Sequence, residues 1–164
     1  GDALPDMQAV DGFNEFDHTQ VVERLRPEWE DRERMARDLA AFPKPARAFQ
    51  HVFEDAMQRW VSGGHDHEYT ESWQAFRQRV ITSLEQLIEY ADGGETLVST
   101  SGGPIAVIAQ HLLELSDRKA LDMNSVIANT SVTRVLHSGA RRSLAVFNNY
   151  SHLEAEDPSL VTFR

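Results

Sequence analysis

Residues 95–115 constrain the fold of this chain more than any other stretch. Residues 96–98 favour a β-strand, and the residues that follow tolerate a tight turn: Ser101, Gly102 and Gly103. After Pro104, apolar side chains recur at the spacing of one helix face: Ile105, Ile108, Leu112 and Leu115. The stretch therefore predicts a strand, a glycine turn and a helix, with Pro104 in the first helical position.

A glycine turn at the start of a helix leaves backbone N–H groups without intrahelical partners at the positive end of the helix dipole. This arrangement suits a phosphate or a carboxylate, although many strand-to-helix turns carry glycine only for close packing. A serine hydrolase with Ser101 as nucleophile is a further possibility. Its nucleophile turn requires glycine two residues before the serine, and Ser99 occupies that position.

Composition excludes several classes of function. The 164 residues suggest a single domain, and 41% hydrophobic with 26% charged residues is ordinary for a globular protein. A net charge of −10 argues against nucleic-acid binding, and no apolar run approaches the roughly 20 residues that span a membrane. The absence of cysteine excludes disulfides and thiolate catalysis and suits a reducing compartment, so we expect a cytoplasmic protein.

Three helical regions precede the glycine turn. Residues 19–41 predict a charged helix interrupted near Pro27, and residues 49–60 predict a second helix with one aromatic face. A third helix starts near Thr70 and leads into the predicted strand. Between the second and third helices, His65 to Glu68 form a polar loop that lacks a third placed ligand, so we expect no metal there.

Two further strands are predicted after the glycine helix, over residues 129–136 and 144–147, joined as a hairpin at Gly139 and followed by an irregular polar tail. A strand followed by a crossover helix requires a parallel pairing, so the predicted class is α/β. The strands are few for the number of helices. Part of a larger sheet is therefore expected to be missing from this chain.

In its order of short motifs the chain resembles the histidine phosphatase superfamily, the phosphoglycerate-mutase-like group, over essentially its whole length. The motifs are Phe13-Asn14-Glu15, Glu71-Ser72-Trp73 with Phe76 and Arg79-Val80, residues 97–105, residues 129–134, and residues 147–153. The resemblance implies a three-layer sandwich with a mostly parallel sheet flanked by helices. It also implies a parent enzyme that acts on a small phosphorylated substrate without a cofactor or metal.

The resemblance also assigns roles to individual residues. Glu15 matches the family's proton-donating acid, and Asn14, Gly102 and Gly103 are expected to bind substrate. Ser101 stands where family members usually carry a second catalytic histidine. His152 matches the tail motif and is expected to be structural.

The family's nucleophile is a histidine in an Arg-His-Gly motif at the end of the first strand, and that motif does not occur in these 164 residues. We therefore expect residues 1–164 to be an incomplete domain that lacks its first strands. Such a domain is expected to form a homodimer or to associate with the missing N-terminal segment. A non-catalytic domain that binds a phosphorylated ligand or a protein is the alternative, and Ser101 favours it.

Overall fold

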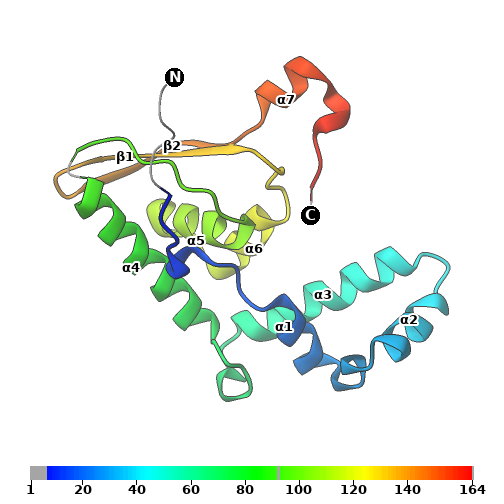
Figure 1. Cartoon of the computed structure of the whole chain (residues 1–164). Helices are drawn as coiled ribbons and strands as arrows, with labels where there is room; N and C mark the ends of the chain where they lie inside the picture. Colours follow the sequence, from blue (N-terminus) through cyan, green and yellow to red (C-terminus); the bar gives the residue numbers. More distant parts are fainter. Residues whose placement is uncertain (1–6, 92, 164) are drawn as a thin grey trace.

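Helices form most of the computed structural model, which describes residues 7–91 and 93–163 (Figure 1). The helices and strands, with η for 3₁₀ turns, are η1 (Asp11–Phe13), α1 (His18–Leu25), η2 (Pro27–Glu30), α2 (Arg32–Ala40), α3 (Pro45–Val61), η3 (Asp66–Glu68), α4 (Trp73–Ala91), α5 (Gly102–Leu113), α6 (Asp117–Asn124), β1 (Val132–Ser138), β2 (Arg141–Asn149), α7 (Ser151–Glu156) and η4 (Pro158–Leu160). No helix in the described ranges is both long and apolar enough to cross a membrane.

The charged N-terminal region breaks where the sequence predicts. Asp17 caps α1 by accepting a hydrogen bond from the Gln20 amide, and Pro27 then opens η2 because its ring is compatible only with the start of a helical turn. Asp31 caps α2 in the same way as Asp17 caps α1. The interruption near Pro27 and the helix over residues 49–60 are therefore confirmed.

An aromatic cluster holds the helices together. The Phe16 ring lies 4.8 Å from that of Trp60 and 5.6 Å from that of Phe76, measured between centroids. Trp73 packs edge-on against Trp60 at 5.3 Å. Rings at these separations bury large apolar areas and attract one another, so the cluster joins α3 and α4 to the segment that enters α1.

The predicted hairpin is present: β1 pairs with β2 in antiparallel fashion around a turn at Gly139, whose φ of +53° suits glycine. The register shifts on either side of Arg134. In Figure 1 the hairpin lies over α5, with which β2 makes contact. The tail is more regular than predicted, because residues 151–156 form α7.

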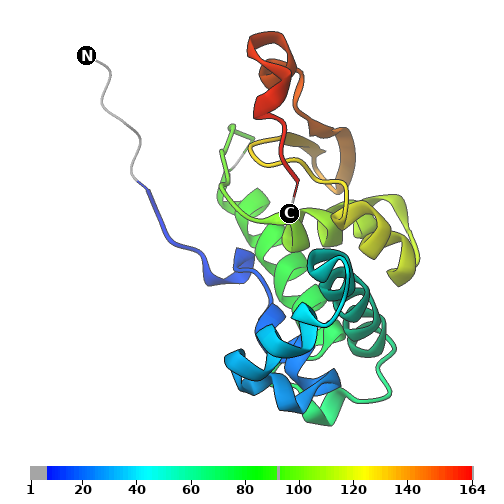
Figure 2. The same cartoon turned by 90° about the vertical axis from the view of Figure 1, so that its right-hand side faces the viewer.

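Residues 95–100 are extended but do not form the predicted strand. They run past the hairpin without joining it (Figure 2), and the described residues supply no backbone partner for the amides and carbonyls of residues 95–99. A strand requires a neighbouring strand to pair its N–H and C=O groups. The described residues therefore contain helices and one antiparallel strand pair, and the predicted mostly parallel sandwich is not confirmed.

The glycine turn and its helix are confirmed with a shift in register. Helix α5 begins at Gly102 rather than at Pro104, and Ser101 lies at its N-cap without a capping side-chain hydrogen bond. Pro104 consequently takes the third helical position. Its missing N–H is harmless there, because the first four N–H groups of a helix have no intrahelical acceptor.

Candidate functional site

The Glu15 carboxyl group lies at the N-terminus of α5. Its Oε2 atom accepts a hydrogen bond from the Gly103 amide at 3.1 Å, and its Oε1 atom accepts one from the Phe16 amide at 3.2 Å. A Cβ atom on Gly103 would overlap this carboxyl group, so the close approach requires glycine. The predicted acid and the predicted oxyanion-binding turn therefore meet in space although 88 residues separate them.

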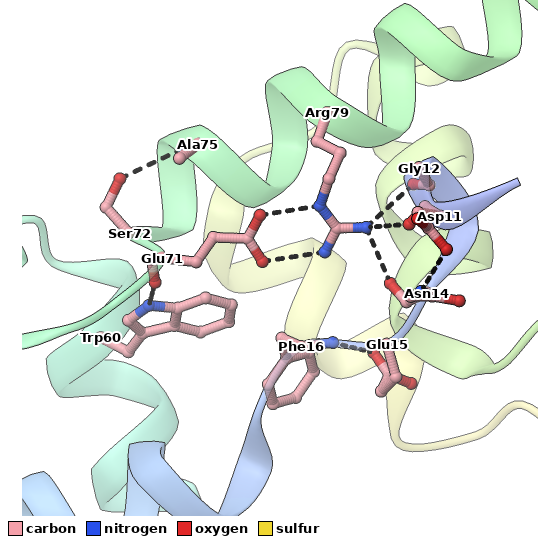
Figure 3. Close-up of polar contacts among 10 residues, drawn as sticks. All are labelled: Asp11, Gly12, Asn14, Glu15, Phe16, Trp60, Glu71, Ser72, Ala75 and Arg79. Carbon is pink, nitrogen blue, oxygen red and sulfur yellow. Dashed lines mark hydrogen bonds and ion pairs between the residues drawn. The ribbon is translucent and has the colours of Figure 1, made fainter.

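Arg79 on α4 binds the backbone that leads to Glu15 (Figure 3). Its Nη1 atom donates to the carbonyl oxygens of Asp11 and Gly12, each at 3.0 Å, and to that of Asn14 at 3.1 Å. Gly12 itself fits against α4 so closely that a Cβ atom would overlap Ser83. The segment before Glu15 is thus fixed to α4 by both hydrogen bonds and packing.

The other side of the Arg79 guanidinium binds Glu71 in a two-pronged ion pair, with Nε–Oε1 at 2.7 Å and Nη2–Oε2 at 2.8 Å. Hydrogen bonds to Glu71 raise the pKa of Arg79 above its ordinary value despite the opposing effect of burial, and the nearby carboxylates, Glu15 among them, act in the same direction. The guanidinium also lies over the Phe76 ring, 5.2 Å from its centroid. Arg79 therefore stays charged.

Ser101 and Gly102 complete the turn. Ser101 is half-buried in an extended conformation, with φ −102° and ψ 179°. A Cβ atom on Gly102 would lie 2.6 Å from Oδ1 of Asn124, at the end of α6. Gly102 thus leaves room for the Asn124 amide, and Gly103 leaves room for the Glu15 carboxyl group. Larger residues at these positions would exclude both side chains.

The site opens into a hollow of about 1840 Å³ that continues to the inner side of the hairpin. Its lining includes Glu15 and Ser101 at one end, and Leu97, Val135 and His137 towards the sheet. Pockets for small ligands typically measure about 300–1,000 Å³. The hollow is therefore larger than a small phosphorylated substrate needs.

Asn14 and the polar loop of residues 65–68, which the sequence analysis also singled out, lie outside the lining of this hollow. The Asn14 side chain donates to Asp11 at 3.3 Å, and Asn14 is not among the residues that line the hollow, so its substrate role stays a prediction. In the polar loop, Glu68 binds Arg59 at 2.7 Å and His65 at 3.1 Å. Throughout residues 7–91 and 93–163, no three metal-binding side chains are grouped to hold an ion.

Sequence reasoning did not find the roles of Glu71, Arg79 and Thr100. Thr100 donates from its hydroxyl to the Phe13 carbonyl at 2.6 Å, which ties the Glu15 segment to the glycine turn. Glu71 and Arg79 belong to one of the quoted family motifs, and Glu71 binds Arg79, but the other partners of Arg79 are backbone carbonyls about 65 residues away. Carbonyl acceptors leave no signature in a sequence.

Comparison with known proteins agrees with the resemblance noted from the motifs. The model of the histidine phosphatase superfamily (branch 1) matches residues 6–150. Searches of curated proteins and of solved structures each returned no match. The family match covers most of the chain, from the segment before Glu15 to the end of the hairpin, and the chain belongs to the histidine phosphatase superfamily.

Proposed function

We propose that this chain supplies the acid and the phosphate-binding turn of an enzyme that hydrolyses, or transfers within a mutase-like reaction, the phosphoryl group of a small phosphomonoester. The observation that carries the proposal is the 3.1 Å hydrogen bond between the Glu15 carboxyl group and the Gly103 amide, inside the region that matches the family. The bond supports the proposal because a carboxyl group lies beside backbone donors of the kind that bind phosphate.

In the proposed reaction, the substrate phosphoryl group displaces the Glu15 carboxyl group from the Gly103 amide. The phosphoryl oxygens then face the backbone N–H groups of Gly102 and Gly103. A histidine nitrogen attacks phosphorus, a P–N bond forms and the P–O bond to the leaving group breaks. Glu15 gives its proton to the leaving oxygen, a step worth roughly 10² to 10⁴ in rate. Water then cleaves the phosphohistidine in the hydrolytic version of the reaction, with Glu15 as the base.

We infer that the nucleophilic histidine comes from an extended segment that occupies the hollow. None of the 7 histidines of this sequence stands in an Arg-His-Gly motif. The hollow has one wall of extended backbone at residues 95–99 and another at β1, so it suits an additional strand of an otherwise incomplete domain. That strand comes from another part of the gene product, and in its absence a second copy of the chain covers the face.

Sedimentation tests this partner proposal. Residues 1–164 alone are expected to dimerise or aggregate, because Leu97 and Leu136 expose apolar surface next to backbone groups without strand partners. A soluble monomer with one sharp cooperative thermal transition would contradict the incomplete-domain proposal. The absence of cysteine supports the further proposal of a cytoplasmic location.

A non-catalytic domain of the same fold is the second candidate, and Ser101 favours it. A serine hydroxyl gives one neutral hydrogen bond to phosphate, whereas a histidinium gives a charged one. Such a domain would bind a phosphorylated ligand or a protein without turnover.

The decisive test compares the complete gene product with its Glu15→Gln variant on an alkyl phosphomonoester, whose leaving group needs a proton. We expect the variant to lose roughly 10² to 10⁴ in kcat. An aryl phosphate is the control substrate, because its better leaving group needs little help and should show a much smaller loss. Equal alkyl turnover by both proteins would exclude Glu15 as the acid, and no turnover by either would favour the binding domain.

A further inference from the structure

We propose that Arg79, anchored by Glu71, is the positioning residue that holds the Glu15 carboxyl group against the N-terminus of α5. The inference rests on the proposed role of Glu15 as proton donor. In this role Arg79 does not touch the substrate and acts through the backbone before Glu15.

The Arg79 guanidinium binds two groups at once, the Glu71 carboxylate and the backbone before Glu15. Nε and Nη2 face the Glu71 carboxylate at 2.7 and 2.8 Å, and Nη1 faces three backbone carbonyl oxygens at 3.0–3.1 Å. A planar fork with fixed donor directions binds both sets at once, which the single ammonium of lysine does not. Glu71 is itself held, because its carbonyl accepts from the Trp60 indole at 2.9 Å.

The three carbonyls all lie in the short segment that precedes Glu15. They belong to Asp11, Gly12 and Asn14, and the Asn14 carbonyl is part of the peptide bond to Glu15. The remaining carbonyl, that of Phe13, accepts from Thr100. All four carbonyls before Glu15 are therefore bound, so the backbone position from which the Glu15 side chain reaches Gly103 is fixed.

A second arginine–glutamate pair allows the positioning role of Arg79 to be tested separately from its effect on stability. Helix α4 carries a second two-pronged pair, in which Arg142 Nη2 meets Glu85 Oε2 at 2.7 Å and Arg142 Nε lies within 3.3 Å of both oxygens. Arg142 joins the hairpin to α4 and binds none of residues 11–15. Arg142→Lys is thus a matched control that breaks a comparable pair without touching the Glu15 segment.

NMR of the complete gene product provides a readout that a purely structural role would not move. The Gly103 amide shift should follow the ionisation of the Glu15 carboxyl group in the wild type, and this titration should vanish in Glu15→Gln. We expect Arg79→Lys to lose most of the titration amplitude, as Glu15→Gln does, whereas Arg142→Lys keeps it. An unchanged Gly103 titration in Arg79→Lys would overturn the proposal.

If Arg79→Lys does not fold, Glu71→Gln takes its place, because it keeps the arginine and weakens only its anchor. We expect a partial loss of the Gly103 titration amplitude in Glu71→Gln, and full amplitude there would also overturn the proposal.

Kinetics of the complete gene product form the second arm. Arg79→Lys should lower kcat on an alkyl phosphomonoester by about 10- to 100-fold with little change in KM, as expected of a misplaced catalytic group. In the Glu15→Gln background the same substitution should cause no further loss. If Glu15→Gln alone proves fully active, the proposed function fails while the NMR result still decides the positioning role.

Discussion

The helical side and the sheet side of this chain treat apolar side chains in opposite ways. On the helical side, Phe76 is fully buried and Trp60 is 1% exposed. On the sheet side, Leu97 is 96% exposed and Leu136 is 48% exposed. The first side is a closed core and the second is an open face over a hollow of about 1840 Å³.

The two sides also differ in which groups of the proposed reaction they contain. The closed side contains Glu15, Arg79 and Glu71, with hydrogen bonds of 2.7–3.1 Å between the arginine and its partners. The open side faces the place where the proposed nucleophile would enter. The segment before Glu15 is therefore held by the closed core, although the face beside it is open.

The largest expected effect is on the closed core. Phe76→Ala should lower the free energy of unfolding by about 3–5 kcal/mol, because it removes a buried ring from an aromatic cluster. Leu97→Ala is the counterpart on the open face. Its side chain is 96% exposed within one chain, so we expect a much smaller loss, limited to the surface that a second copy of the chain covers. Chemical denaturation at several protein concentrations measures both variants. Equal costs for the two variants at every concentration would contradict the difference between the two sides.

The next effect concerns Ser101, at the border between the two sides. Ser101→His should raise kcat of the complete gene product on a phosphomonoester by roughly 10²- to 10³-fold, the usual worth of one electrostatic donor to a developing charge. Ser99→His is the control, since Ser99 lies in the exposed segment before the turn. Steady-state kinetics decide the point. An inactive Ser101→His protein would favour the binding domain over the enzyme.

A smaller effect tests how tightly the Glu15 segment packs on α4. Gly12→Ala should destabilise the protein by about 1–3 kcal/mol, because the new methyl group overlaps Ser83. Gly64→Ala is its matched control, since that glycine is exposed and a Cβ there would only touch Ser62 at 3.7 Å. Thermal melting compares the two variants. An equal response would mean that the segment before Glu15 is loosely held.

The smallest effect is a pH dependence on the helical side. The hydrogen bond from Arg59 lowers the pKa of Glu68 below its ordinary value of 4.5. The folded state then binds the proton less readily than the unfolded chain, so this contribution is present above pH 4.5 and is lost as the pH falls through the lowered pKa. Glu68→Gln should make the acid limb of stability less steep. An unchanged limb would show that the Arg59–Glu68 pair does not form in solution.

The sequence predicted the secondary structure of the closed side better than that of the open side. The spacing of apolar residues predicted α3 and α4, and the glycine turn predicted α5, because these patterns depend on local periodicity. The prediction of a strand over residues 96–98 was wrong for the described chain. These residues have β propensity, but a strand also needs a neighbouring strand to pair with its backbone. Motif resemblance brought Glu15 and Gly103 together, but the Arg79 contacts to carbonyl oxygens could only be seen in three dimensions.

One titration tests the central claim that acid and phosphate-binding turn share the N-terminus of α5. Inorganic phosphate is added to the labelled complete gene product at neutral pH while backbone amide shifts are followed by NMR. We predict shifts at Gly102 and Gly103, and tighter binding in Glu15→Gln, because phosphate no longer competes with a carboxylate for the Gly103 amide. Silent glycine amides in both proteins, with shifts confined to His65 to Glu68, would contradict the account.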